Sequence, residues 1–241
     1  MKPICVIPAR AGSKRIPGKN LRLLGGKPLL HWIVQAALKS GIFEKIIISS
    51  DSREILNSGL QVRHGSPTEV VMAPTRPAFL SDDDARVEHV FKHEVEAYCN
   101  LLSCPPEYVC MAMPTAPFTR PASFKLGYER IYDSQLESVF LGVKTDFKTQ
   151  RTVEMDEAGG ISPVTGDWDE FAAPSQLLKE TYRPTYGGMF VKTDYLLQTG
   201  EYYAPYRQGI VEVPKWEGID IDTEDDWLEA EQWLIWRQSN G

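Results

Sequence analysis

Cysteine, histidine and basic charge are all scarce in this 241-residue sequence. It has four cysteines, four histidines, and 26 lysines and arginines against 33 aspartates and glutamates, which gives a net charge of −7. Cys5, Cys99, Cys104 and Cys110 show no C-x-x-C spacing, so we expect reduced, structural cysteines and no zinc centre. An acidic chain repels the phosphate backbone, so we expect no nucleic-acid partner.

Long apolar runs are missing as well. No stretch reaches the ~18 apolar residues of a membrane span, and Met1 leads directly into a first apolar run rather than into a signal peptide. We therefore expect no membrane association and a cytoplasmic location. The length suits one large α/β domain, so residues 1–241 are predicted to form a single domain.

The basic side chains that are present gather behind the first apolar run. Residues 2–7 predict a buried strand, which ends in the loop P-A-R-A-G-S-K-R-I-P-G-K-N at residues 8–20. Small residues let backbone N–H groups approach phosphate oxygens, and the four lysines and arginines of the loop neutralise charge. We predict a loop that is exposed until it binds a polyanion, with triphosphate as the candidate.

Two common phosphate loops do not fit this spacing. A Walker loop has four residues between its glycines, whereas Gly12 and Gly18 have five between them and are followed by Lys19-Asn20. A dinucleotide fingerprint opens a helix, but the first helical pattern here starts only at Pro28. A solvated basic turn is the structural alternative, although a surface turn gains nothing from following a buried strand so closely.

Strand-like and helix-like segments alternate along the chain. The spacing of apolar residues predicts strands at 46–50, 108–113, 138–143, 188–191 and 210–213, and helices at 28–39, 82–100 (capped by Ser81), 123–132 and 223–237. This order predicts an α/β fold with a mostly parallel, doubly wound, Rossmann-like sheet. Ligands in such sheets bind at the carboxyl ends of the strands.

The alternation of strand-like and helix-like segments stops between about residues 144 and 182. Glycines and prolines punctuate this stretch, and residues 151–155 and 161–164 could pair as a hairpin across Gly159-Gly160. We predict an insertion there.

Two acids stand just before the last predicted helix. Asp220 and Asp222 are separated by one residue, so both side chains point to the same face of an extended segment. Neighbouring carboxylates repel each other unless a cation lies beside them, and Mg²⁺ suits one or two carboxylates shared with substrate phosphates. Helix capping by surface acids is the alternative, which we assign to Asp225 and Asp226 instead.

The string I-P-A-R-A-G-S-K-R-I-P-G-K-N resembles the signature of the acylneuraminate cytidylyltransferase family, which includes CMP-sialic acid synthetases and relatives acting on pseudaminic and legionaminic acids. Further matches follow in the family's order at residues 76–83, 114–118, 182–184 and 219–223. The resemblance covers almost the whole chain, and its first and last motifs are the specific ones.

The resemblance implies that the anomeric hydroxyl of an acidic nine-carbon sugar attacks the α-phosphate of CTP and expels pyrophosphate. Arg10 and Lys19 would be catalytic, and Asp220 and Asp222 would be catalytic and hold Mg²⁺. The residues implied for the nucleotide subsite are Ala9, Gly12, Ser13, Asn20 and Arg76. Those expected on the sugar side are Met113, Thr115, Arg151, Arg183 and Phe190.

The sugar side departs from the sialic-acid members. They usually carry glutamine where this sequence has Met113, and arginine where it has Ser175. Met113 offers an apolar, adaptable wall, which keeps a pseudaminic-type or other modified nonulosonate open as substrate. Lys148, Arg151 and Arg183 are candidates for binding its carboxylate. In relatives the insertion is a dimerisation arm that reaches into the neighbour's crevice, so we expect a homodimer.

Two other functions stay as alternatives. A sugar-1-phosphate or Kdo-type nucleotidyltransferase would share the metal, although the former usually has a glycine-denser first loop. A regulatory nucleotide-binding subunit would not need Asp220 and Asp222. His89 and His93 lie one helical turn apart, but no third zinc ligand is evident. Trp227, Trp233 and Trp236 form a helical stripe that we assign to the core or to a dimer contact.

Overall fold

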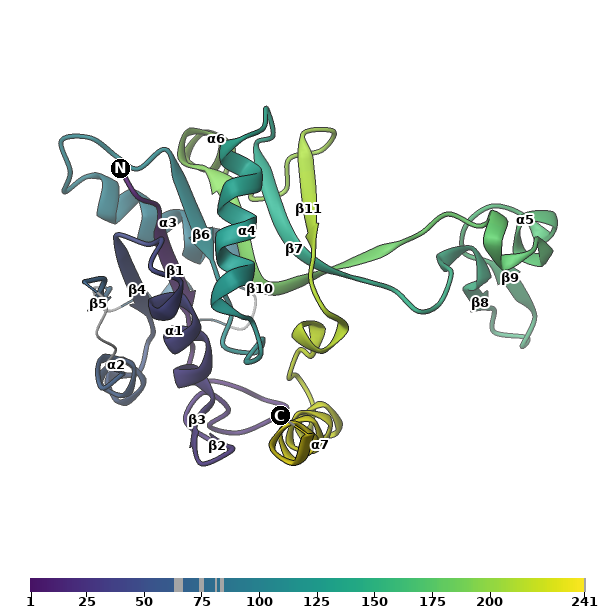
Figure 1. The fold of residues 1–241 in the computed structure, drawn as a ribbon, viewed down its shortest axis with the longest axis horizontal. Helices are drawn as coiled ribbons and strands as arrows, with labels where there is room; N and C mark the ends of the chain where they lie inside the picture. The colour runs from purple at the N-terminus through teal and green to yellow at the C-terminus, as the bar shows by residue number, and fades with distance from the viewer. Residues whose placement is uncertain (63–66, 74–75, 81, 83–84, 241) are drawn as a thin grey trace.

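A computed structural model describes residues 1–62, 67–73, 76–80, 82 and 85–240. Over this part of the chain a seven-stranded sheet has the order β11-β7-β10-β6-β1-β4-β5, with helices on both faces (Figure 1). The strands are β1 (Ile4–Pro8), β4 (Lys45–Ser49), β5 (Glu69–Met72), β6 (Tyr108–Met111), β7 (Ser138–Lys144), β10 (Tyr182–Lys192) and β11 (Gln208–Glu212).

The sheet is mainly parallel, as the sequence predicts. The strand β1 pairs in parallel with β4 and β6, β4 pairs in parallel with β5, and β7 pairs in parallel with β11. The exception is β10, which is antiparallel to both of its neighbours, β6 and β7. The predicted mostly parallel α/β fold is therefore confirmed, with one central strand reversed.

Alternating side chains of the sheet build a core on each face. Cys5 and Ile7 of β1 join the cluster beneath α1 (Leu29–Ser40), α2 (Arg53–Leu60) and α4 (Pro121–Tyr132). Ile4 and Val6 join the opposite cluster, beneath α3 (Val87–Cys99) and α6 (Thr193–Thr199). This two-sided burial explains why β1 is apolar at every position rather than at alternate ones.

A third cluster forms where the long C-terminal helix α7 (Glu224–Asn240) meets the N-terminal loop. Ile16 of the loop and Trp227 of the helix are both 1% exposed and pack in this cluster. The short strands β2 (Leu23–Leu24) and β3 (Lys27–Pro28) form a hairpin beside it. The contact packs the N-terminal loop against the last helix, so the basic loop and the segment before α7 become neighbours. In Figure 1 the β2–β3 hairpin lies beside α7.

Two expectations about local structure need correction or limits. The helix predicted from residue 82 begins only at Val87, because the backbone of Arg86 is extended, with φ −66° and ψ 136°. Its proposed cap, Ser81, lies outside the described residues. Two short 3-10 helices, η1 (Ala78–Leu80) and η4 (Lys215–Gly218), precede α3 and α7.

Between β7 and β10 the chain leaves the sheet and projects as an arm, residues 145–181 (Figure 1). It carries η2 (Thr149–Arg151), β8 (Val153–Met155), β9 (Ile161–Pro163), α5 (Trp168–Ala172) and η3 (Ser175–Leu177). The strands β8 and β9 pair antiparallel, which confirms the predicted hairpin. Met155 and Leu177 are 74% and 73% exposed, so the arm presents apolar side chains to its surroundings.

The four cysteines are free, as predicted, and three of them are buried while Cys104 is exposed. Within the described ranges, no helix has both the length and the apolar character that crossing a bilayer requires.

Candidate active site

A cleft of about 510 Å³ opens at the carboxyl ends of β1 and β6. This is where ligands bind in open α/β sheets, and it is the crevice that the sequence predicts. Three segments supply its charged lining and most of its other polar side chains. They are Arg10, Ser13, Lys14, Arg15, Lys19 and Asn20 of the loop, Thr115 after β6, and Asp220 and Asp222 before α7.

The loop at residues 9–20 is tied to the body of the protein by its backbone. The N–H of Ala9 donates to the carbonyl of Ser49 at 2.8 Å, and the N–H of Ala11 donates to Asp51 Oδ1 at 2.8 Å. Asn20 is 6% exposed, and its Nδ2 donates to the carbonyl of Arg10 at 2.8 Å. The side chain of Ala9 is buried, so only its backbone is available to a nucleotide. Hydrogen bonds within the chain therefore fix the shape of the loop.

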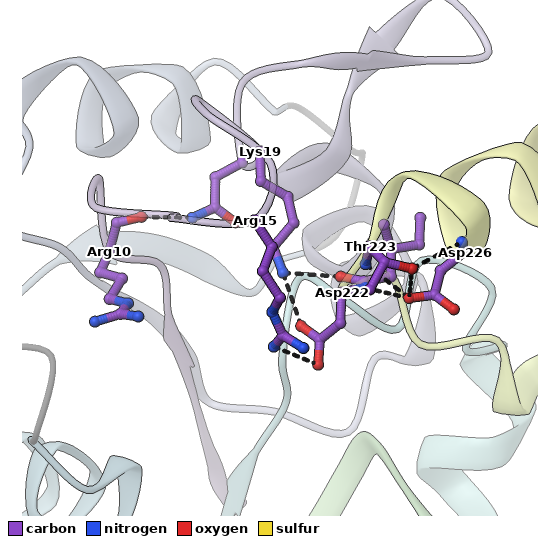
Figure 2. Close-up of polar contacts among 8 residues, drawn as sticks. Arg10, Arg15, Lys19, Asp222, Thr223 and Asp226 are labelled. Carbon is purple, nitrogen blue, oxygen red and sulfur yellow. Dashed lines mark hydrogen bonds and ion pairs between the residues drawn. The ribbon is translucent and has the colours of Figure 1, made fainter.

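Lys19 joins the loop to the acidic segment (Figure 2). Its Nζ donates to the carbonyl of Ile221 at 2.8 Å and to Asp222 Oδ1 at 3.0 Å, and its side chain is only 12% exposed. On the other oxygen of the same carboxylate, Arg15 Nη2 lies 2.9 Å from Asp222 Oδ2. The expectation that this loop is exposed without ligand is therefore wrong for Lys19, because Asp222 supplies a partner.

Asp220 has a different environment, although it is only two residues away. The Thr115 hydroxyl donates to its carboxylate, and the N–H of Ile221 donates to the Thr115 carbonyl at 2.8 Å. Its Oδ1 is buried, and no hydrogen-bond partner for it occurs among the described residues. Burial raises the pKa of Asp220, and the Asp222 charge adds to that rise, while Thr115 and Lys19 oppose it.

The start of α7 holds Asp222 in place. The N–H groups of Asp222 and Thr223 donate to Asp226 Oδ2 at 3.0 and 2.7 Å, and the N–H of Asp226 donates back to Thr223 Oγ1 at 3.3 Å (Figure 2). Burial pushes the pKa of Asp226 up, but these hydrogen bonds outweigh it and lower the pKa. The capping role predicted for Asp226 is confirmed, and the cap uses the carboxylate of Asp226 rather than that of Asp222.

These residues fit a magnesium ion. Asp220 offers a buried oxygen without a partner, and both carboxylates line the same cleft as the basic loop. Among the described residues no group of three His, Cys, Asp or Glu side chains could by itself hold a metal. A cation here would draw its other ligands from water and phosphate, which is how Mg²⁺ usually binds.

Phe190 and Arg76 are predicted site residues whose buried side chains do not line the cleft. Phe190 of β10 is fully buried and stacks on Phe43, with ring centroids 6.2 Å apart, so its predicted contact with the sugar is wrong. Arg76 is 6% exposed and does not line the cleft. It donates to the carbonyls of Ser49 and Leu80 at 2.8 and 3.5 Å, and burial lowers its pKa. Arg76 thus ties η1 to the end of β4.

The remaining predicted residues separate into two groups. Met113 and Thr115 line the cleft, and Gly12 lies on the exposed part of the loop. Arg183 lies just outside, where its Nη2 donates to the carbonyl of Gly218 at 2.6 Å and its charge lowers the pKa of Asp220. Arg151 is on the arm and donates to the carbonyl of Ala173 at 3.0 Å, so it does not reach the cleft of its own chain.

Two tyrosines in the cleft were missed by the sequence analysis. Tyr186 and Tyr202 both line it, and Tyr202 is 4% exposed. Burial raises the pKa of both, and the neighbouring Tyr203 adds to the rise. No motif or spacing in the sequence marks either tyrosine as a cleft residue.

Comparison with known proteins adds chemistry to this geometry. The profile of a family described as "Cytidylyltransferase" matches residues 4–157. The chain is 30% identical to the pseudaminic acid cytidylyltransferase of Campylobacter jejuni (serotype O:2) over 226 residues, which are 94% of this chain and 93% of that protein. It is 28% identical to the CMP-N,N'-diacetyllegionaminic acid synthase of Legionella pneumophila over 241 residues, covering 96% of each.

A solved structure supports the fold independently. The chain resembles CMP:2-keto-3-deoxy-manno-octonic acid synthetase, which was solved in complex with CTP, with a TM-score of 0.66. The match covers 98% of this chain and 100% of the other at 15% sequence identity. At that identity the likeness shows a shared fold.

Proposed function

We propose that this chain, which belongs to the cytidylyltransferase family, joins CTP to a nonulosonic acid and releases a CMP-sugar and pyrophosphate. One observation carries the proposal: the basic loop and the Asp220–Asp222 segment, at opposite ends of the chain, line one cleft. A loop for phosphates beside two carboxylates for a metal is the arrangement that nucleotidyl transfer needs. Both curated relatives described above carry names of enzymes for modified nonulosonic acids.

The chain's own residues would act mainly by position and charge. Arg10 and Lys19 would neutralise the triphosphate and the departing pyrophosphate, each such positioned charge contributing a few kcal/mol to the transition state. Ser13 and the backbone around Gly12 would hydrogen-bond phosphate oxygens, because hydrogen bonds within the chain fix the shape of the loop. Holding the sugar hydroxyl in line with the α-phosphate would supply the rest.

We propose Mg²⁺ as the cofactor, held by Asp220 and Asp222. When bound, such an ion neutralises phosphate charge and lowers the pKa of the attacking hydroxyl. Thr115 would orient Asp220 through its hydrogen bond, and the cap at Asp226 would fix the backbone of Asp222.

On the sugar side, Met113 would give an apolar wall for an acyl or methyl group. Arg183, beside Asp220, is the candidate of the same chain for the sugar carboxylate. We propose that the arm completes the site of a second copy in a homodimer, where Arg151 would add a cation. The free cysteines fit the cytoplasm as the location of the reaction.

The test is an assay of pyrophosphate release, with each of the four nucleoside triphosphates against pseudaminic, legionaminic and N-acetylneuraminic acids, Kdo and a sugar 1-phosphate. We expect release only with CTP and a nonulosonic acid, and the fastest release with a pseudaminic- or legionaminic-type sugar. Release with Kdo alone, or with a sugar 1-phosphate alone, would overturn the substrate class. The Asp222→Asn variant is the control for contaminating activity.

A further inference from the structure

The two acids of the cleft differ in how their oxygens are occupied. Both oxygens of Asp222 are engaged, one by Lys19 at 3.0 Å and the other by Arg15 at 2.9 Å. Asp220 keeps Oδ1 without a partner among the described residues. The carboxylate of Asp222 is therefore closed by side chains of the phosphate loop (Figure 2), whereas that of Asp220 is open to a cation.

Arg15 and Lys19 are not equivalent partners. Lys19 is 12% exposed and is also bonded to the carbonyl of Ile221, so it is firmly held. Arg15 is 64% exposed, and its long side chain can leave Asp222 at little cost, since an exposed ion pair of this kind is weak. Arg15 stands in the loop that lines the cleft, so a triphosphate bound there would compete directly with Asp222 for its guanidinium.

We infer that Arg15 is a positioning residue that blocks Asp222 until a triphosphate draws it away, so that the divalent cation and the nucleotide bind cooperatively. A guanidinium on the carboxylate both occupies an oxygen and repels a second cation. A triphosphate removes that obstacle and adds negative charge of its own. The inference rests on the proposed metal site, and adds to it the residue that couples the two ligands.

Cooperativity of this kind is reciprocal, so it can be measured from either ligand. From the metal side, the probe is Mn²⁺ alone, titrated into nucleotide-free protein and followed by the EPR signal of the free ion. We expect Arg15→Gln to bind Mn²⁺ about three- to tenfold more tightly than wild type, because the competing cation is gone. Arg15→Lys retains the charge and should stay close to wild type.

Arg22→Gln is the matched control for a lost positive charge. Arg22 is close in sequence but pairs with Glu224, with its Nη1 2.6 Å from Oε1, so it does not compete for Asp222. Its Mn²⁺ affinity should equal that of wild type. An equal gain in Arg22→Gln and Arg15→Gln would show a general charge effect and overturn the role of Arg15.

From the nucleotide side, the probe is CTP in the presence of EDTA, titrated by calorimetry. Asp222→Asn releases both cations, so it should bind metal-free CTP about three- to tenfold more tightly than wild type, although it is expected to be inactive. Weaker or unchanged CTP binding by this variant would contradict the inference. Circular dichroism melts would verify that each variant is folded.

The double variant Arg15→Gln/Asp222→Asn separates failure of this inference from failure of the metal site. If Arg15→Gln binds Mn²⁺ like wild type while Asp222→Asn binds it more weakly, the metal site stands and the blocking role of Arg15 is wrong. If Asp222→Asn leaves Mn²⁺ affinity unchanged even in the Arg15→Gln background, Asp222 is not a ligand. The proposed metal site and the inference then fail together.

Discussion

Replacing the two cleft acids singly with asparagine should change the stability of the metal-free protein in opposite directions. Asp220 carries a buried oxygen without a partner among the described residues, and burial raises its pKa, so its ionised form is disfavoured by folding. Asparagine keeps the shape and can still accept the hydrogen bond from Thr115. Asp222 instead neutralises Lys19 and Arg15, so its charge supports the fold.

The expected magnitudes follow from these contacts. Removing a charge that is half-buried and incompletely hydrogen-bonded should stabilise Asp220→Asn by about 1 kcal/mol. Removing the charge of Asp222 should destabilise the folded protein by about 1 kcal/mol, because the mostly buried Lys19 loses its counterion. The exposed ion pair with Arg15 adds little to this loss. In a chain of this length each such step moves Tm by about 2–4 °C. The two variants should therefore melt about 4–8 °C apart.

The assay is thermal unfolding at pH 7 with EDTA, at low salt so that screening does not hide the ion pairs. Turnover of both folded variants should fall at least ~10²-fold, since each loses a proposed metal ligand. The reasoning is refuted if Asp220→Asn melts below Asp222→Asn, or if the two melt together. Full activity in either folded variant would exclude its assigned metal role.

Three further outcomes are expected. Lys19→Ala should raise the KM for CTP or lower turnover by about 10–100-fold. The variant should also melt a few degrees lower, because Nζ of Lys19 donates to both Ile221 and Asp222. Unchanged steady-state kinetics would make Lys19 purely structural. Mixing the Arg151→Ala protein with the inactive Asp222→Asn protein should restore part of the activity after subunit exchange. In the heterodimer, one crevice has an intact Asp222 and receives an arm that carries Arg151. No recovery of activity would place Arg151 outside the partner's site. Burial and the nearby Lys39 lower the pKa of Lys27 to about 8, whereas the hydrogen bond to Glu69 raises the pKa of Lys45. An acylating reagent at pH 8 should therefore modify Lys27 before Lys45. Equal rates of modification, measured by mass spectrometry, would contradict this.

The alternation of strands and helices was predictable because burial on two faces leaves a strong local pattern. β1, β4 and β6 are short apolar runs, and their parallel pairing follows from the helices between them. The antiparallel direction of β10 was not predictable in this way. It depends on the route of the arm, which leaves at Lys144 and returns at Tyr182, and no local pattern encodes that route.

The candidate site was predictable to a similar degree. The loop and the two acids were found because phosphate and metal binding require small, basic and acidic residues at particular spacings. Phe190 was misplaced because both faces of β10 are buried at that point, and the sequence does not show that Phe190 packs into the core beneath α4. Tyr202 was missed because an isolated tyrosine carries no spacing signal, and only packing brings it to the cleft.

The sequence by itself determined which chemistry the cleft can perform, because functional groups are properties of single residues and short segments. Only the tertiary structure decided how those groups are charged and paired. Lys19 contacts Asp222 although 203 positions of the chain separate them. Because of this contact Asp222 is ion-paired, whereas Asp220, two residues away, has a buried oxygen without a partner among the described residues. Electrostatic energy depends on distance in space and on access to water, and both arise only when the chain folds.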